Sequence, residues 1–354
     1  MLEPINTNSH EKYMRRCISI ALKGAGNVAP NPMVGAVLVY QDTIIGEGWH
    51  EQYGQAHAEV NCINNVPVHL QQLIPESTLY VSLEPCAHHG KTPPCSDLII
   101  QHKIPHVVVG CVDTFAAVAG RGIQKLRDAG IQTIYPILED ECRQLNKHFF
   151  TFHEKKRPFV LLKWAESSDG YLSAFGSRRL MLSNVFSQIL VHKLRSEYAS
   201  ILVGYNTVLA DNPALDNRHW AGKSPTRIVI DFNNTLPKNI KLFDQQQATI
   251  VFNFQVQKTE GNICWIKLEQ GNVAQQVLDF LYQQNIQSVL IEGGNKTLQS
   301  FIDAGLWDEA LCIQSPVTIG CGTVAPALKQ AQLLEQKTLQ QDHLLFFRNE
   351  TYHL

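Results

Sequence analysis

Three metal-ligating residues and one carboxylate constrain this chain more than any other part of its sequence. His57 and Glu59 lie in the motif His57-Ala58-Glu59, and Cys86 and Cys95 bracket a short loop. One imidazole and two thiolates leave the fourth position of a tetrahedral zinc ion open for water. Glu59 is close enough along the chain to carry that water's protons. The pattern therefore predicts a catalytic zinc site and a fold that brings these segments together.

A structural zinc site is the alternative interpretation, because such a site has four protein ligands. His88 and His89, in the loop between the cysteines, are the candidate fourth ligands. The order H-x-E followed by P-C and a second Cys is typical of zinc deaminases and favours the open site. Eight residues lie between Cys86 and Cys95, however, rather than the two of the P-C-x-x-C signature.

Local sequence patterns predict how the ligands converge. We expect a helix to begin near His57, a buried strand over 79–83 to lead into Cys86, and another helix to begin at Cys95. Helical side chains two positions apart do not share a face. His57 and Glu59 can therefore meet one ion only at the first turn of their helix.

The chain is long enough for two domains, with 354 residues of which 44% are hydrophobic and 18% charged. Strands alternate with helices in both halves, so we expect an α/β fold throughout. A helix over 139–150 closes the first half, and a charged stretch over 153–158 ends in a proline. We place the first domain at 1–150, a linker at 151–157 and the second domain at 158–354.

Charge and cysteine usage narrow the possible partners and the compartment. The net charge is −2, which gives no basic surface for nucleic acid or for an anionic membrane. We find neither a signal peptide nor an apolar run of membrane-spanning length. Nine scattered cysteines are an odd number, so we expect free thiols and a cytoplasmic protein.

The second half carries weaker ligand signals. Gly293-Gly294 follows an expected strand over 288–291. The local sequence fits a plain strand-to-helix connection and a phosphate-binding loop equally well. The polar segment 206–213 follows another expected strand, at the end where α/β folds bind ligands. The cations that could bind a substrate phosphate are Lys163, Arg195 and Arg218.

Over essentially its whole length the chain resembles the family of bifunctional riboflavin-biosynthesis deaminase–reductases. The resemblance rests on the following segments: 29–35, 57–59 and 84–95 in the first half, and Lys163, 167–170, 194–195, 201–204, 207–213 and 292–294 in the second. It implies a cytidine-deaminase-like three-layer N-terminal domain and a dihydrofolate-reductase-like C-terminal domain. It also implies two cofactors, zinc and NADPH, and a homo-oligomer.

The resemblance implies two consecutive reactions on small phosphorylated pyrimidines. The first is hydrolytic deamination of 2,5-diamino-6-ribosylamino-4(3H)-pyrimidinone 5′-phosphate, and the second is reduction of the ribosyl group to ribityl. By similarity the metal ligands are His57, Cys86 and Cys95, with Glu59 as the proton carrier. The first substrate would contact Asn31, His50 and Lys91, and the second Lys163, Arg195, Leu215, Arg218 and Glu292. NADPH would contact Ala165, Thr207, Asp211, Gly294, Asn295, Lys296 and Thr297.

Two rival functions make different predictions. A deaminase of nucleic-acid bases would have a basic surface and the P-C-x-x-C spacing, and this sequence has neither. A non-catalytic zinc-binding interaction module would need a fourth protein ligand and would have no use for Glu59.

Overall fold

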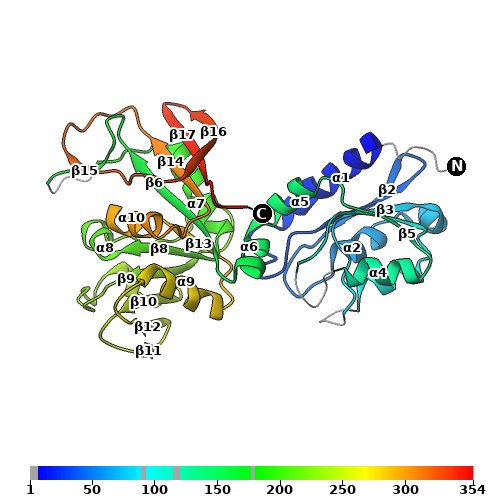
Figure 1. The fold of residues 1–354 in the computed structure, drawn as a ribbon, viewed down its shortest axis with the longest axis horizontal. Coiled ribbons are helices and arrows are strands. Elements are labelled where there is room, and N and C mark those ends of the chain that lie inside the picture. The colour runs from blue at the N-terminus through cyan, green and yellow to red at the C-terminus, as the bar shows by residue number, and fades with distance from the viewer. Residues whose placement is uncertain (1–6, 89–92, 115–119, 177–179, 354) are drawn as a thin grey trace. The chain divides into compact units, whose positions relative to one another are not determined.

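The structure is a computed structural model that describes residues 7–88, 93–114, 120–176 and 180–353. These residues form two compact units, which divide between Lys155 and Lys156 (Figure 1). The helices of the first unit are α1 (Thr7–Ala21), η1 (Leu22–Gly24), α2 (Ala58–Asn64), η2 (Val68–Glu76), α3 (Cys95–Gln101), α4 (Arg121–Asp128), α5 (Glu139–Leu145) and α6 (Lys147–Lys155). Its strands are β1 (Gly35–Tyr40), β2 (Thr43–Trp49), β3 (Thr78–Leu83), β4 (His106–Cys111) and β5 (Gln132–Ile134).

The first unit has three layers. Its sheet has the order β2-β1-β3-β4-β5, in which β3, β4 and β5 are parallel and β1 pairs antiparallel with both neighbours. Alternate strand residues point to opposite faces, so each face can build its own core. One core joins the sheet to α2, α3 and α4, and the other joins it to α1, α5 and α6. Figure 1 shows α1 and α5 on one side of the sheet and α2 and α4 on the other.

The second unit is built on a ten-stranded sheet with the order β11-β12-β10-β9-β8-β13-β6-β14-β17-β16. The strands from β12 to β14 in that order are parallel, and antiparallel strands complete both edges. The strands are β6 (Phe159–Glu166), β7 (Tyr171–Ala174), β8 (Ser200–Gly204), β9 (Thr226–Ile230), β10 (Thr249–Asn253), β11 (Lys258–Glu260), β12 (Ile263–Lys267), β13 (Ser288–Ile291), β14 (Glu309–Gln314), β15 (Gly322–Val324), β16 (Ala331–Leu339) and β17 (Asp342–Asn349). The helices are α7 (Val185–Glu197), α8 (Tyr205–Asp211), η3 (Lys241–Phe243), α9 (Val273–Gln283) and α10 (Asn295–Asp303).

The core of this unit explains why its parallel strands read as apolar runs. Parallel strands are covered on both faces, so few of their positions face water. The buried side chains of β6, β8, β13 and β14 pack with those of α9 and α10 in one cluster. Apolar burial of this kind contributes roughly 25 cal/mol per Å² removed from water, which makes it the main stabilising term of the unit.

The structure differs from the sequence-based expectation at the end of the first unit. The single helix expected over 139–150 is two helices, α5 and α6, with Asn146 between them. Residues 151–155 of the expected linker belong to α6. In the part of the chain that the structure describes, no helix is both long enough and apolar enough to cross a membrane.

Candidate functional site

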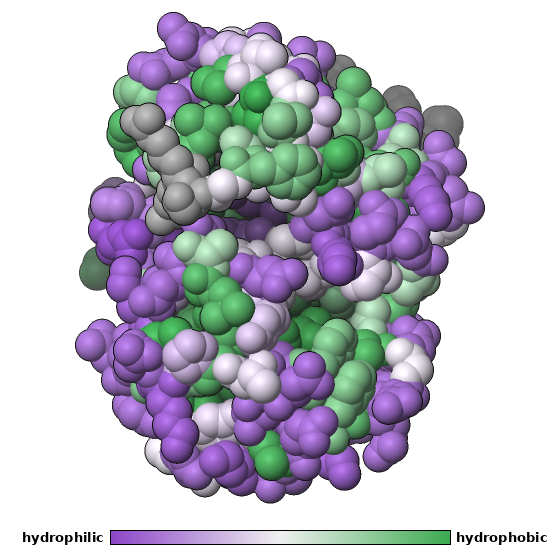
Figure 2. Space-filling model, turned by 90° about the vertical axis from the view of Figure 1, so that its left-hand side faces the viewer, coloured by the Kyte–Doolittle hydropathy of each residue, from purple (hydrophilic) through white to green (hydrophobic). Residues whose placement is uncertain are grey.

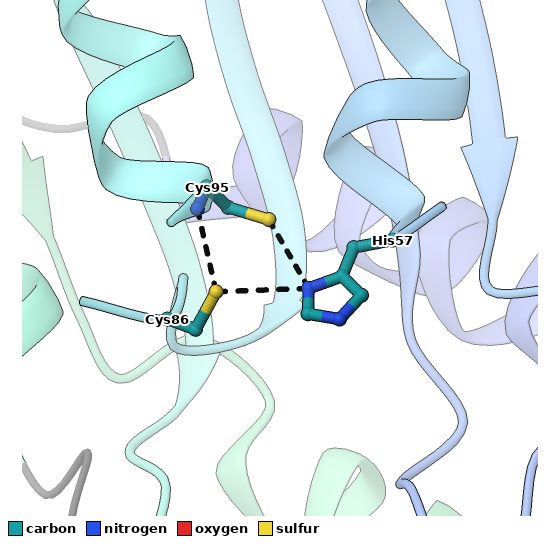
Figure 3. Close-up of side chains that lie close together, drawn as sticks. All are labelled: His57, Cys86 and Cys95. Atoms are coloured by element: carbon teal, nitrogen blue, oxygen red, sulfur yellow. Dashed lines mark hydrogen bonds between the residues drawn. The ribbon is translucent and has the colours of Figure 1, made fainter. Parts of the chain in front are cut away.

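Three elements of the first unit bring His57, Cys86 and Cys95 together (Figure 3). His57 is the residue directly before α2, and its backbone is extended rather than helical. Cys86 follows the end of β3, and Cys95 is the first residue of α3. The three ligand atoms all lie within 4.8 Å of one another.

The spacing of these atoms fits a tetrahedral zinc ion. At a tetrahedral angle, Zn–N bonds of about 2.0 Å and Zn–S bonds of about 2.3 Å place N and S about 3.5 Å apart. His57 Nδ1 lies 3.6 Å from Cys86 Sγ and 3.3 Å from Cys95 Sγ. The donor set of one imidazole and two sulfurs is also one that zinc prefers. The described residues therefore fit zinc and leave one coordination position without a protein ligand.

The histidines considered as a fourth ligand do not join this group in the described residues. His88 is exposed and lies outside the three-residue cluster, and His89 lies outside the residues that the structure describes. Lys91, expected to contact substrate, also lies outside them. The described geometry thus matches an open site more closely than a structural one.

The two cysteines differ in pKa, with that of Cys86 lowered and that of Cys95 raised. A hydrogen bond from Cys95 to the sulfur of Cys86 lowers the pKa of Cys86 to about 4, with His57 contributing in the same direction. The Cys95 backbone N–H also donates to Cys86 Sγ at 3.3 Å. At least one sulfur of the pair is therefore a thiolate at neutral pH, which is the form that binds metal.

Glu59 lies on the first turn of α2, two residues after His57, and is 3% exposed. Burial raises the pKa of its carboxyl group, while the neighbouring His57 opposes that rise. A raised pKa brings a carboxylate closer to neutral pH, where it can both take up and release a proton. Burial next to the ligands therefore suits Glu59 to proton transfer.

His50 and Asn31 lie beside the metal ligands and are linked to each other. His50 Nδ1 lies 3.0 Å from the carbonyl oxygen of Ala56, so this nitrogen carries the hydrogen. Burial lowers the pKa of His50, which favours the neutral ring. Its Nε2 then accepts a hydrogen bond from Asn31 Nδ2 at 3.2 Å, which leaves the carbonyl end of the Asn31 amide for another partner. The ring of His50 packs edge-on against that of His57, with centroids 5.5 Å apart.

Glu84 is a residue of the site that the sequence interpretation missed. Its buried carboxylate accepts hydrogen bonds from four backbone N–H groups, those of Asp113, Gly120, Gly122 and Ile123, at 2.8–3.2 Å. Gly122 lies so close that a Cβ there would come within 1.9 Å of the Pro85 carbonyl oxygen. Glu84 thus fixes the segment leading to Cys86 against the start of α4. In the sequence, Glu84 is marked only by its place directly after an apolar strand and within a segment that resembles the family.

In the second unit, β8 and β13 are neighbouring strands. The connections that leave them lead to opposite sides of the sheet. After β8 the chain passes through α8 to β9 on one side, and after β13 it passes through α10 to β14 on the other. Open α/β sheets bind ligands at such a point, outside the carboxyl ends of the strands. The expected NADPH-binding residues Thr207, Asp211 and 294–297 all lie on α8, on α10 or directly before α10. Ala165 lies near the end of β6, which pairs with β13.

The turns after β8 and β13 touch each other closely. The Gly204 N–H donates to the Gly293 carbonyl oxygen at 2.9 Å, and a Cβ on Gly204 would lie 2.3 Å from Thr297 Oγ1. A Cβ on Gly294 would lie 3.2 Å from Thr207 Oγ1. Asn295 Oδ1 is buried and has no hydrogen-bond partner among the described residues. The backbone N–H groups of a turn at a helix start fit the phosphate of a nucleotide cofactor, and the unused Asn295 acceptor fits a donor such as a ribose hydroxyl.

Three charged residues expected at the second substrate lie together. Arg195 of α7 donates to both carboxylate oxygens of Glu292, at 3.0 and 2.8 Å. Burial alone would raise the pKa of Glu292, but Arg195 and Lys163 lower it to about 2. Burial lowers the pKa of Lys163, and Glu292 opposes that shift. The cluster places two cations and one anion beside the end of β13.

A loop carrying Leu215 and Arg218 adjoins this cluster. Arg195 Nη1 donates to the Asp216 carbonyl oxygen at 3.1 Å, and the Arg218 N–H donates to His192 Nδ1 at 3.3 Å. Leu215 is 3% exposed, whereas Arg218 is exposed and pairs with Asp216. The face of the second unit drawn in Figure 2 is hollowed across its middle, with apolar and hydrophilic side chains on its borders.

Comparison with known proteins identifies both units. Residues 7–111 match the cytidine and deoxycytidylate deaminase zinc-binding region, and residues 158–351 match the RibD C-terminal domain. The riboflavin biosynthesis protein RibD of Aquifex aeolicus is 36% identical over 91% of this chain and 90% of its own length. The Escherichia coli RibD is 32% identical over 88% of each chain.

Solved structures agree with these relatives. A diaminohydroxyphosphoribosylaminopyrimidine deaminase/5-amino-6-(5-phosphoribosylamino)uracil reductase from Thermotoga maritima has a TM-score of 0.90 and 34% identity, and the match covers 97% of this chain and 99% of that one. Acinetobacter baumannii RibD has a TM-score of 0.87 and 28% identity over the same shares. The expected fold class is confirmed, with a cytidine-deaminase-like unit before a reductase unit of the dihydrofolate-reductase type. This chain belongs to the RibD family of riboflavin biosynthesis proteins.

Proposed function

We propose that this chain catalyses both reactions for which its Thermotoga maritima relative is named, one in each unit. The first is deamination of 2,5-diamino-6-ribosylamino-4(3H)-pyrimidinone 5′-phosphate, and the second is reduction of the ribosyl side chain to ribityl. The observation that carries the proposal is the ligand set His57, Cys86 and Cys95, together with the buried carboxylate of Glu59, which interacts electrostatically with these ligands. An open coordination position beside a proton carrier has no use in a purely structural site.

In the first unit, His57, Cys86 and Cys95 would hold zinc. Zinc bound there would lower the pKa of a water molecule, so that it could act as a nucleophile at neutral pH. Glu59 takes a proton from the attacking water and passes it to the ring nitrogen of the substrate. It then takes the remaining proton from the newly added hydroxyl group and gives it to the 2-amino group. The C–N bond breaks, ammonia leaves, and a carbonyl group remains on the ring. Asn31, His50 and Lys91 orient the pyrimidine for this step.

In the second unit, the turns around Thr207 and 294–297, with Ala165 and Asp211, would hold NADPH. NADPH bound there would supply the hydride for the reduction of the ribosyl group at C1′. Lys163, Arg195 and Arg218 bind the phosphorylated substrate, since cations form the strongest hydrogen bonds with phosphate. Glu292 holds the Arg195 guanidinium in place through two bonds, and Leu215 supplies an apolar wall.

Three further properties belong to the same proposal. We assign deamination to residues 1–150 and reduction to residues 158–354, which agrees with the observed division at Lys155. We expect a homo-oligomer, because the second unit exposes large apolar side chains such as Phe175, Met181 and Val185. We place the protein in the cytoplasm, where the thiols of the zinc site stay reduced.

The test uses the purified chain with its zinc content measured. The diaminopyrimidinone ribosylamine 5′-phosphate is supplied, and ammonia release and then NADPH oxidation are followed. Ammonia followed by NADPH oxidation is the expected result, and removal of zinc by a chelator should abolish the first signal. A zinc-loaded chain that releases no ammonia would overturn the substrate assignment. Ammonia without later NADPH oxidation would overturn the assignment of the second unit.

A further inference from the structure

The loop over residues 30–33 brings Asn31 to the metal site. Asn31 Nδ2 donates to His50 Nε2 at 3.2 Å, and the His50 ring packs against the metal ligand His57. This chain of contacts joins Asn31 to the zinc site, and the Asn31 N–H also donates to the Val28 carbonyl oxygen at 2.9 Å. Its position therefore depends on how firmly the loop backbone is held.

Asn146 holds that backbone from a position 113 residues away in sequence. Its Oδ1 accepts a hydrogen bond from the Met33 N–H at 2.7 Å, and its Nδ2 donates to the Met33 carbonyl oxygen at 2.8 Å. The Asn146 side chain is 3% exposed, so water cannot readily replace these bonds. The Asn146 amide pairs with both the backbone N–H and the backbone carbonyl of one residue, as a neighbouring β-strand does. It therefore fixes the peptide planes on both sides of that residue.

The position of Asn146 shows that its side chain serves the loop rather than its own helix. Asn146 ends α5, and its backbone N–H already bonds to the Arg143 and Gln144 carbonyl oxygens. Both polar ends of its amide are used on Met33. Beyond the loop, the Gly35 N–H donates to Ser82 Oγ at 3.1 Å as β1 begins, so Asn146 holds the part of the loop nearer to Asn31.

We infer that Asn146 is a positioning residue of the deamination site, which acts through the Met33 backbone to set Asn31 for the pyrimidine substrate. This inference rests on the proposed function of the first unit. A residue that orients a substrate contact changes substrate binding more than the chemical step. Asn146 therefore affects KM, while zinc binding and kcat depend on other residues.

The experiment compares Asn146→Ala with Asn146→Asp, Asn31→Ala and the double variant of residues 31 and 146. We expect Asn146→Ala to raise KM for ammonia release about tenfold, which corresponds to about 1.4 kcal/mol. Zinc content and kcat should stay close to those of the unchanged protein. Asn146→Asp keeps the acceptor for the Met33 N–H but loses the donor, and should give a smaller rise. The double variant should match Asn31→Ala alone, because both substitutions remove the same contact.

Asn349→Ala is the matched control. Asn349 in the second unit is also buried, and its amide likewise donates to a backbone carbonyl, that of Trp307, and accepts a backbone N–H, that of Thr351. Its replacement by alanine removes hydrogen bonds of the same kind but should leave the KM for deamination unchanged. An unchanged KM in Asn146→Ala would overturn the inference. So would a KM change in the double variant equal to the product of the changes in the two single variants. In both cases ammonia release would still support the proposed function. Absence of ammonia release from the unchanged, zinc-loaded protein would overturn both.

Discussion

Glu292 is a buried carboxylate held between two cations. Arg195 binds it through two hydrogen bonds, and Lys163 lies on the neighbouring strand β6. Burial of any of these charges alone would be costly, so the cluster is stable only as a set. The set also fixes the guanidinium and ammonium groups that we assign to the second substrate.

Glu292→Gln tests this residue-scale balance. The substitution keeps the shape of the side chain but leaves Lys163 and Arg195 without a buried counter-charge. We expect a loss of about 3 kcal/mol in the free energy of unfolding, measured with urea, and a clear fall in NADPH oxidation. The control is Glu260→Gln, because Glu260 is exposed and pairs with Lys258 on the surface. That change should leave the free energy of unfolding almost unaltered, because exposed ion pairs contribute little. Equal losses in the two variants would contradict the balance.

Residues with distinctive chemistry could be predicted from sequence, and residues that bind backbone could not. His57, Cys86, Cys95 and Glu59 combine ligand types and spacing that few other functions need, and the structure brings the three ligands together. Glu84 and Asn146 instead meet backbone N–H and carbonyl groups from distant segments. Every residue offers such groups, so nothing in the sequence singles out the partners.

At the scale of elements, the ligand crevice of the second unit depends on two strand-to-helix turns in contact. Gly204 ends β8 and Thr297 lies in the first turn of α10. A Cβ on Gly204 would lie 2.3 Å from Thr297 Oγ1, so any side chain there requires Thr297 to shift. The contact sets the separation of α8 and α10, and with it the positions of Thr207 and residues 294–297.

Gly204→Ala should force these turns apart. The backbone of Gly204 has a φ of −88°, which alanine adopts readily, so the effect comes from the clash with Thr297 Oγ1 alone. We expect NADPH affinity, measured by fluorescence titration, to fall about tenfold or more. Adding Thr297→Ala removes the clashing oxygen, and the double variant should bind NADPH better than Gly204→Ala alone. Unchanged affinity in Gly204→Ala would show that the spacing of the turns does not matter for the cofactor.

The alternation of strands and helices could be predicted from the sequence. The exact helix boundaries and the order of strands in the sheet could not. Apolar runs such as 201–204 and 288–291 predict buried strands, and the structure has β8 and β13 there. The break at Asn146 carries no Pro or Gly to mark it, so an uninterrupted helix was expected over 139–150. Strand order depends on long-range pairing, which local patterns do not encode.

At the scale of the whole molecule, two units with separate cores carry separate sets of titrating groups. In the second unit His192 is 5% exposed, and burial lowers its pKa to about 4, helped by the nearby Arg195, His219 and Arg218. His192 Nδ1 accepts the Arg218 N–H, which only an unprotonated nitrogen can do. The folded second unit therefore requires a neutral His192.

The stability of the second unit should consequently depend on pH. Between the ordinary pKa of about 6.5 and the folded value of about 4, the unfolded chain binds more protons than the folded one. The stabilisation is present above about pH 6.5, and the free energy of unfolding should fall as pH drops from about 6.5 towards 4. Tryptophan fluorescence suits the measurement, since Trp164, Trp220, Trp265 and Trp307 all lie in this unit.

His192→Asn is the matched variant for this pH experiment. The Asn amide oxygen can occupy the place of Nδ1 and accept the same N–H, but the side chain does not titrate. The decline between about pH 6.5 and 4 should be shallower in this variant. An identical slope in both proteins would show that His192 does not cause the pH dependence.

The central claim is that one chain holds a zinc-dependent deamination site and a separate reduction site. Glu59→Gln tests it most directly, with zinc content, ammonia release and NADPH oxidation measured on the intact chain. We predict that the variant keeps its zinc, that ammonia release falls by about 10² to 10⁴, and that NADPH oxidation is unchanged when the deaminated intermediate is supplied. Full ammonia release from the zinc-loaded variant, or loss of NADPH oxidation along with it, would contradict this account.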